Sequence, residues 1–273
     1  MYDLHIHTTA SDGTLTPAEV VRKAREAALT GIGITDHDAI EGITSAISWG
    51  KAMEIDIVPG IELSTHWNDM EIHVLGYFID YNSEQLLEML TFLKQKRLER
   101  IKKIAIKAIQ LGYPITAEEI EQIAEGRAVG RPHLAQLLMK KGYISSIEEG
   151  FQRFLTKGKP MYVPRYKITP TEAISIIKGA KGVPVLAHPS LYNPTWVVLL
   201  NELVEAGLEG IEVYYPGHTN ACVAELTKVC TLHNLVLTGG SDFHGIDVKA
   251  NKLGSFGVSD LNLAELKGRK KRV

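Results

Sequence analysis

YDLHIHTTASDGTLTPAE, residues 2–19, combines a short strand pattern with a strongly signalled helix start. Tyr2 to His7 is apolar enough for a buried strand. Thr16 then supplies an N-cap, Pro17 a proline at the first helical position, and Glu19 the acidic partner of a capping box. We therefore predict a strand over residues 2–7 and a helix over residues 17–28. A strand followed closely by a helix is the βα unit of a parallel sheet.

The same βα rhythm recurs toward both ends of the chain. Predicted strands cover residues 2–7, 31–36, 56–63, 71–78, 183–189, 210–216 and 235–244. Predicted helices among them cover residues 17–28, 39–53, 170–179, 195–206 and 219–233. Seven strands in this order predict an α/β fold, a distorted (β/α)7 barrel one unit short of the usual eight.

Residues 83–160 lack strand patterns and are predicted to be helical throughout. A long helix ends at Gly112, Thr116 and Glu119 form another capping box, and helical pieces cover residues 132–141 and 146–156. We therefore predict a barrel made of residues 1–82 and 161–273, with residues 83–160 inserted as a helical subdomain.

Length and composition indicate a folded soluble protein. The 273 residues are 45% hydrophobic and 23% charged, which is typical of globular domains. No apolar stretch approaches the length that spans a bilayer, and no signal-like start is present, so we expect a cytoplasmic protein without membrane contacts. Cys222 and Cys230 offer neither a disulfide framework nor a thiolate metal site, and we expect both to be ordinary small packing residues.

Charge is unevenly distributed along the chain. The insertion has 14 Lys or Arg against 9 Asp or Glu, whereas the rest has 16 against 23. The segment KGRKKRV, residues 267–273, adds a basic tail. An acidic body is usually only a solvated surface, but it also suits carboxylates that bind metal cations.

Histidines and carboxylates gather where the predicted strands end, which is the active face of such barrels. The residues at or near these ends are His5, His7, Asp12, Asp36, His37, Glu62, His188, Asp242 and His244, and His73 lies within the fourth strand. His5 and His7 share one strand face, although such a pair alone is weak evidence. The recurrence at equivalent positions makes chance improbable. The donors lack sulfur and exceed the capacity of one ion, so we predict two or three divalent ions, favouring Mn²⁺ with Zn²⁺ or Fe²⁺ as alternatives.

The sequence resembles the PHP superfamily, the polymerase and histidinol phosphatase group of metal-dependent phosphoesterases. The matching segments are DLHIHTTASDGTLTP (3–17), GIGITDHDAIEG (31–42), VPGIELS (58–64), EIHVLGYF (71–78), GRPHLAQLL (130–138), VLAHP (185–189), GIEVYYPGHT (210–219) and GSDFHG (240–245). The insertion with its GRPH segment is most similar to the branch that acts on nucleotides, which includes 3′,5′-nucleoside bisphosphate phosphatases and 5′→3′ exoribonucleases.

The resemblance implies a PHP barrel with a trinuclear metal centre, and for the helical insertion it implies a role as a substrate cap. One metal would be bound by His5, His7 and Asp242, with Glu62 bridging to a second metal that also takes His73 and His188, and a third would be bound by Asp12, His37 and His244. Asp12 stands where other branches have a histidine, which weakens any preference for zinc over manganese. Asp36 is expected to orient ligating imidazoles from outside this set. Asp38 is a weaker candidate for that role, and a helix cap is an equally good reading of it.

The mechanism implied is in-line attack on phosphorus by a metal-bound hydroxide, with the metals neutralising the phosphoryl oxygens and the leaving group. Arg131 and His133 would hold a phosphate of the substrate, since an arginine binds phosphate through two parallel hydrogen bonds. From composition alone, both residues simply start a helix. His218 is a candidate phosphate contact or proton donor, although a lone loop histidine needs no function.

Three functions follow as hypotheses. The first is a metal-dependent phosphoesterase that removes phosphate from 3′,5′-nucleoside bisphosphates or trims RNA 5′ ends. The second is a phosphatase for a small metabolite such as histidinol phosphate, and the third is a non-catalytic metal-binding PHP module. The GRPH segment favours the first, and the complete ligand set argues against the third. We expect nucleotides or short RNA ends as substrates and no binding of double-stranded DNA.

Overall fold

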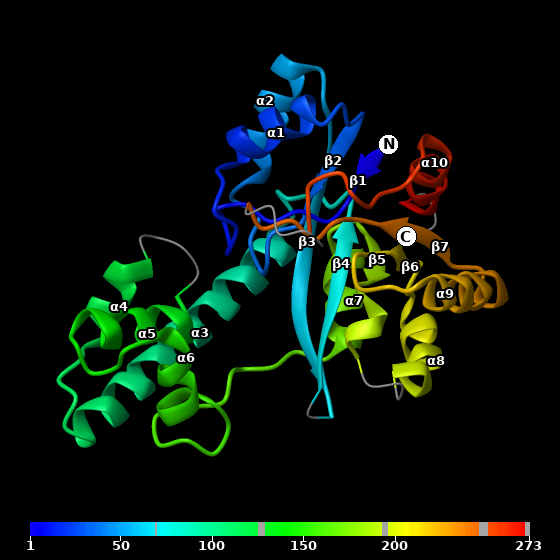
Figure 1. The fold of residues 1–273 in the computed structure, drawn as a ribbon. Helices are drawn as coiled ribbons and strands as arrows, with labels where there is room; N and C mark the ends of the chain where they lie inside the picture. Colours follow the sequence, from blue (N-terminus) through cyan, green and yellow to red (C-terminus); the bar gives the residue numbers. More distant parts are fainter. Residues whose placement is uncertain (69, 125–128, 193–195, 246–250, 271–273) are drawn as a thin grey trace. The chain divides into compact units, whose positions relative to one another are not determined.

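The computed structural model describes residues 1–68, 70–124, 129–192, 196–245 and 251–270. Its strands are β1 (Tyr2–Asp3), β2 (Gly31–Ile34), β3 (Asp56–Trp67), β4 (Met70–Tyr77), β5 (Val183–Leu186), β6 (Gly210–Tyr214) and β7 (Val236–Gly239). Its α-helices are α1 (Pro17–Glu26), α2 (Ile43–Met53), α3 (Glu84–Gln110), α4 (Ala117–Ala124), α5 (Arg131–Lys140), α6 (Ile147–Gly150), α7 (Pro170–Gly179), α8 (Trp196–Ala206), α9 (Asn220–His233) and α10 (Asp260–Arg269) (Figure 1).

The chain divides into two compact units. One consists of Met1–Met89 with Lys167–Val273 and contains all the named strands, and the other is Leu90–Tyr166. The strands form one sheet in the order β1-β2-β3-β4-β5-β6-β7. The edge strands β1 and β7 approach each other. The backbone N–H of Leu4, just after β1, donates to the carbonyl of Gly239 at 3.2 Å, and Ile6 forms an isolated β-bridge with Phe243. These contacts nearly close the sheet into a barrel, as predicted.

Strand β4 corrects one expectation, because it is antiparallel to both β3 and β5 rather than parallel. The cause is the connection between Trp67 and Met70, which is far too short for the dozen or more residues that a parallel crossover needs. The two strands form the long hairpin seen in Figure 1. Its direction brings the first half of β4 beside the carboxyl end of β3, where His73 pairs with Ser64. His73, although it lies inside a strand, is thereby placed at the face of the barrel where the other strands end.

Several strands end earlier than predicted, because the chain stops forming regular strand-to-strand hydrogen bonds where the candidate site begins. β1 and β7 end at Asp3 and Gly239, whereas strands to His7 and His244 were expected. His188 and Asp242 have φ angles of 26° and 52°, which regular strands do not accommodate. By contrast β3 extends to Trp67, so that Glu62 lies well inside the strand rather than near its end.

The helix signals differ in how well they locate boundaries. The capping boxes predicted at Thr16 and Thr116 are present, and α1 and α4 begin right after them. Helix α7 also begins after a capping box, at Thr169. Helix α2 begins at Ile43 rather than Ala39, and the expected helix over 146–156 splits into α6 and a π-helical turn over Phe151–Leu155. Helix α10 was not predicted.

Two basic residues of the segment 267–273 contribute to packing. Arg269 is buried at the end of α10, where its guanidinium pairs with Glu209 at 3.3 Å and donates to the Asn234 side chain at 3.2 Å. Lys270 donates to the carbonyl of Phe78 at 2.8 Å. These residues fasten α10 to the barrel.

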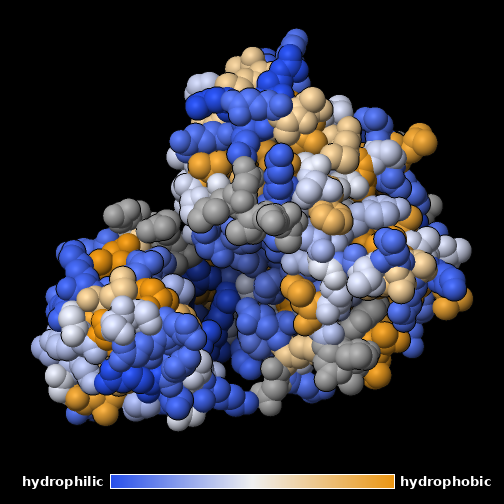
Figure 2. All heavy atoms as spheres, viewed as in Figure 1, coloured by the Kyte–Doolittle hydropathy of each residue, from blue (hydrophilic) through white to orange (hydrophobic). Residues whose placement is uncertain are grey.

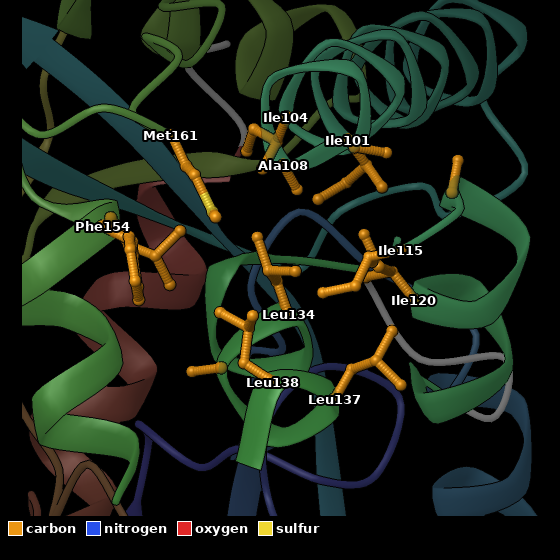
Figure 3. Close-up of a cluster of buried hydrophobic side chains, with 14 of the residues drawn as sticks. Ile101, Ile104, Ala108, Ile115, Ile120, Leu134, Leu137, Leu138, Phe154 and Met161 are labelled. Carbon is orange, nitrogen blue, oxygen red and sulfur yellow. The ribbon is translucent and has the colours of Figure 1, made fainter. Parts of the chain in front are cut away.

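The Leu90–Tyr166 unit has a hydrophobic core of its own. Figure 3 shows Ile101, Ile104 and Ala108 of α3 facing Leu134 and Leu138 of α5, with other apolar side chains around them. The residues labelled there are almost fully buried. Burial of this kind is what allows an inserted segment to form a compact unit.

The described surface gives no sign of a membrane-spanning element. Among the described residues, no helix is both long enough and apolar enough to cross a bilayer. The face drawn in Figure 2 is mostly hydrophilic, and its hydrophobic side chains form small separate groups.

Both cysteines are free thiols, in agreement with the sequence.

Candidate metal centre

The carboxylate of Glu62 is the centre of the candidate site. Glu62 is almost completely buried in β3, and five imidazoles surround it. Its Oε2 lies 3.3 Å from His5 Nε2, 3.2 Å from His7 Nε2 and 3.1 Å from His37 Nδ1. Its Oε1 lies 2.9 Å from His73 Nδ1 and 3.2 Å from His188 Nε2. The five histidines come from β4 and from the segments after β1, β2 and β5.

Two aspartates complete the cluster. Asp242, after β7, places Oδ1 3.2 Å from His7 Nε2 and 3.5 Å from His5 Nε2. Asp12 places Oδ1 3.6 Å from His7 Nδ1 and 3.5 Å from His244 Nε2. The structure therefore brings all nine expected side chains into one connected cluster.

Three groups of these side chains can hold a metal ion, since their ligand atoms lie within 4.8 Å of one another. The groups are His5 with His7 and Asp242, then His7 with Asp12, His37 and His244, and finally His37 with Glu62 and His73. The first two contain the expected sets, with His7 added to the second. His188 reaches Glu62 without joining a group. The assignment of each ligand to a particular metal stays a prediction.

Unsatisfied buried atoms show that this cluster fits cations. Seven of its polar atoms are buried and have no hydrogen-bond partner in the described part of the chain: His5 Nε2, His7 Nδ1 and Nε2, His37 Nδ1, Glu62 Oε2, His73 Nδ1 and His188 Nδ1. Native proteins rarely leave such atoms unpaired. Nitrogen and oxygen donors that converge without hydrogen bonding are what a metal site requires.

The electrostatics of the cluster point the same way. Burial opposes ionisation of Glu62, yet electrostatic interaction with the imidazoles of His37, His73 and His5 holds its pKa well below the usual range. Burial likewise disfavours charge on His7, but Asp242 and Glu62 raise its pKa to about 9. Against the effect of burial, neighbouring carboxylates raise the pKa values of His5 and His73 as well, whereas burial lowers the pKa of His37 to about 4. Bound divalent cations would displace protons from the imidazoles that carry them.

The environment of Asp36 corrects a further expectation. Its carboxylate accepts hydrogen bonds from the Thr8 backbone N–H at 2.7 Å, the Thr8 hydroxyl at 2.8 Å and the Ser11 hydroxyl at 2.6 Å. Within the described residues it therefore organises the loop that carries Asp12 rather than a ligating imidazole. Asp38 accepts from the Ser64 backbone N–H at 3.1 Å and does not cap α2, whose N-cap is Gly42.

Arg131 and His133 lie in the Leu90–Tyr166 unit, at the start of α5. Arg131 Nη1 donates to the carbonyl of Leu155 at 3.2 Å, and the Gly130 backbone N–H donates to His133 Nδ1 at 3.0 Å. His133 thus caps the start of α5, and Arg131 joins that start to the π-helical turn that ends at Leu155. Arg131 also lies near another arginine. Burial, together with the neighbouring positive charge of Arg131, lowers the pKa of Arg100 to about 10.

His218 is engaged with backbone groups on both sides of its ring. Its Nδ1 lies 2.8 Å from the carbonyl of Val213, and the Ser190 backbone N–H donates to its Nε2 at 3.4 Å. Burial lowers the pKa of His218. This arrangement favours a role in holding the Ser190 backbone over the expected proton donation.

Sequence reasoning missed three residues around the cluster. Glu212 contacts His5 at 2.9 Å, the Tyr215 hydroxyl donates to Asp242 at 3.2 Å, and the His73 backbone N–H donates to the Tyr192 hydroxyl at 2.8 Å. A glutamate in the middle of the apolar run GIEVYY was the available signal for Glu212.

Comparisons with known proteins agree with this geometry. The model of the PHP domain family matches residues 3–156. The chain belongs to the PHP domain family. It is 36% identical over 250 residues to "5′-3′ exoribonuclease Rnm" of Escherichia coli (strain K12), covering 89% of this chain and 85% of that protein. It is 31% identical over 253 residues to "3′,5′-nucleoside bisphosphate phosphatase" of Chromobacterium violaceum, covering 89% and 86%.

A solved structure extends the match to nearly the whole chain. A protein from Bifidobacterium adolescentis, assigned as a metal-dependent phosphoesterase, superposes with a TM-score of 0.83 at 29% identity, covering 98% of this chain and 96% of that one. These findings confirm the resemblance, the fold class and the place of the chain among metal-dependent phosphoesterases.

Proposed function

We propose that the protein is a cytoplasmic PHP phosphoesterase that removes phosphate from 3′,5′-nucleoside bisphosphates, trims RNA 5′ ends, or does both. The observation that carries this proposal is the cluster around Glu62, with its seven unsatisfied buried donor atoms. The activities of the Escherichia coli and Chromobacterium violaceum relatives supply the substrate class.

The proposed metal sites follow the expected sets. His5, His7 and Asp242 would hold one cation, Glu62 with His73 and His188 would hold a second, and Asp12, His37 and His244 would hold a third. Bound cations supply Lewis acidity that neutralises phosphoryl oxygens and makes water nucleophilic near neutral pH. Mn²⁺ is the proposed metal, with Zn²⁺ or Fe²⁺ as alternatives, because the donors lack sulfur and Asp12 supplies a hard oxygen ligand where other branches of the superfamily have a histidine. The protein's own part is placement, and the Tyr215 hydroxyl orients Asp242 through its hydrogen bond.

A substrate panel tests the proposed activity. Purified protein with added Mn²⁺ is incubated with adenosine 3′,5′-bisphosphate, AMP, a 5′-phosphorylated RNA oligonucleotide and histidinol phosphate, while released phosphate and nucleotides are measured. We expect turnover of the bisphosphate, the RNA or both to exceed that of histidinol phosphate by at least about tenfold, which corresponds to about 1.4 kcal/mol in transition-state binding. Preference for histidinol phosphate would contradict the nucleotide assignment, and no turnover would favour a non-catalytic module.

Arg131 is proposed to hold a phosphate of the substrate, with His133 beside it. Loss of a charge-assisted contact costs about 1.5–3 kcal/mol, so Arg131→Ala is expected to lower kcat/KM for the nucleotide about ten- to a hundredfold. Hydrolysis of p-nitrophenyl phosphate should change little, because that ester presents nothing further to bind. Metal content should stay constant.

Arg153→Ala is the matched control for this variant. Arg153 is an arginine of the same unit that forms an exposed ion pair with Glu149, so its loss should leave both activities near wild type. If Arg131→Ala slows both substrates equally, or removes metal, the residue serves only the start of α5.

A further inference from the structure

Glu212 is a fully buried carboxylate that none of the proposed ligand sets uses. It lies in the middle of β6, and its side chain has no exposure to solvent. A buried carboxylate is costly unless both oxygens are paired. Both are paired here, and each partner belongs to a histidine of the candidate metal centre.

The first oxygen fixes the ring of His5. Glu212 Oε1 lies 2.9 Å from His5 Nδ1. A carboxylate offers only lone pairs, so Nδ1 must carry the proton of this hydrogen bond. The lone pair for a metal is then on Nε2, which faces Glu62 Oε2 at 3.3 Å and Asp242 Oδ1 at 3.5 Å. That same Nε2 is one of the buried atoms without a hydrogen-bond partner.

The second oxygen holds the backbone of His188. Glu212 Oε2 accepts a hydrogen bond from the His188 backbone N–H at 2.8 Å. His188 has a φ of 26°, a strained conformation that persists only where its surroundings enforce it. This conformation accompanies a ring position in which Nε2 lies 3.2 Å from Glu62 Oε1. The rings of His5 and His188 stack nearly parallel, with centroids 5.8 Å apart.

We propose that Glu212 is a positioning residue for the metal centre, which selects the ring nitrogen that His5 presents and anchors the backbone that directs His188. One side chain then sets the geometry on both oxygens of Glu62. Outer partners of metal-binding histidines commonly contribute ten- to a hundredfold to metal affinity. This inference rests on the proposed metal-dependent function, but it assigns a role to a residue outside the ligand sets.

The test compares metal affinity in Glu212→Gln and in a matched control. Glutamine keeps the shape of the side chain but has a single acceptor oxygen, so one of the two donors loses its partner. Glu209→Gln is the control, because Glu209 lies just before β6 and pairs with Arg269, away from the candidate site. Mn²⁺ binding is measured by competition with a chelator of known affinity, and folding by circular dichroism and thermal unfolding.

We expect Glu212→Gln to weaken at least one bound Mn²⁺ equivalent by about ten- to a hundredfold while the fold is retained. Glu209→Gln should lower the unfolding temperature without changing Mn²⁺ affinity. Wild-type affinity within twofold in Glu212→Gln would overturn the inference and leave Glu212 as a packing residue. If the glutamine variant does not fold, Glu212→Asp takes the same test, because aspartate is too short to reach both partners.

Wild-type protein separates this inference from the proposed function. If wild type binds no Mn²⁺, the proposed function fails as well. If wild type binds Mn²⁺ and the Glu212 variant binds it equally well, only the positioning role is wrong.

Discussion

His7→Ala is expected to abolish phosphoester hydrolysis while leaving the protein folded. His7 belongs to two of the three groups that can hold a metal ion, and its Nε2 lies 3.2 Å from both Glu62 and Asp242. Removing an outer partner of a metal ligand already costs ten- to a hundredfold, so we expect loss of this ligand to lower kcat/KM more than about a hundredfold. Steady-state kinetics with saturating Mn²⁺ measures the effect.

His233→Ala is the control for that experiment. His233 is the last residue of α9 and has no proposed function, so its loss should leave activity near wild type. Similar unfolding curves for wild type and both variants would show that the loss is chemical. An active His7→Ala enzyme would mean that the metal-binding residues are misassigned.

Metal removal should have an equally large effect on activity. Protein dialysed against a strong chelator is expected to lose turnover and to unfold at a lower temperature, because cations that bind only the folded state stabilise it. A cation at a thousandfold excess over its Kd contributes about 4 kcal/mol. Adding Mn²⁺ back should restore both properties. Activity and unfolding temperature that survive exhaustive chelation would rule out a metal-dependent mechanism.

The barrel was predictable from sequence because its signals are local. The capping boxes at Thr16 and Thr116 locate two helix starts, and the apolar runs locate the strands. The direction of β4 was equally open to inference, since the few residues between Trp67 and Met70 permit only a hairpin. The expectation of a wholly parallel sheet overlooked that connection.

The candidate site was predictable as a set of residues but not as a geometry. Strand ends place histidines and carboxylates on one rim, whereas the contacts of Glu62 depend on how distant segments pack. The positive φ of His188 and Asp242 has only a weak sequence signal, because neither position is a glycine, although Asp and His adopt such angles more often than most residues. Asp36 illustrates the same limit, since its partners Thr8 and Ser11 became evident only in the folded chain.

Elemental analysis of the protein after saturation with Mn²⁺ and removal of free metal is the decisive measurement. The cluster around Glu62 offers three groups of donors, so we expect more than one Mn²⁺ equivalent per chain. One equivalent or less at saturation would contradict a multinuclear metal centre.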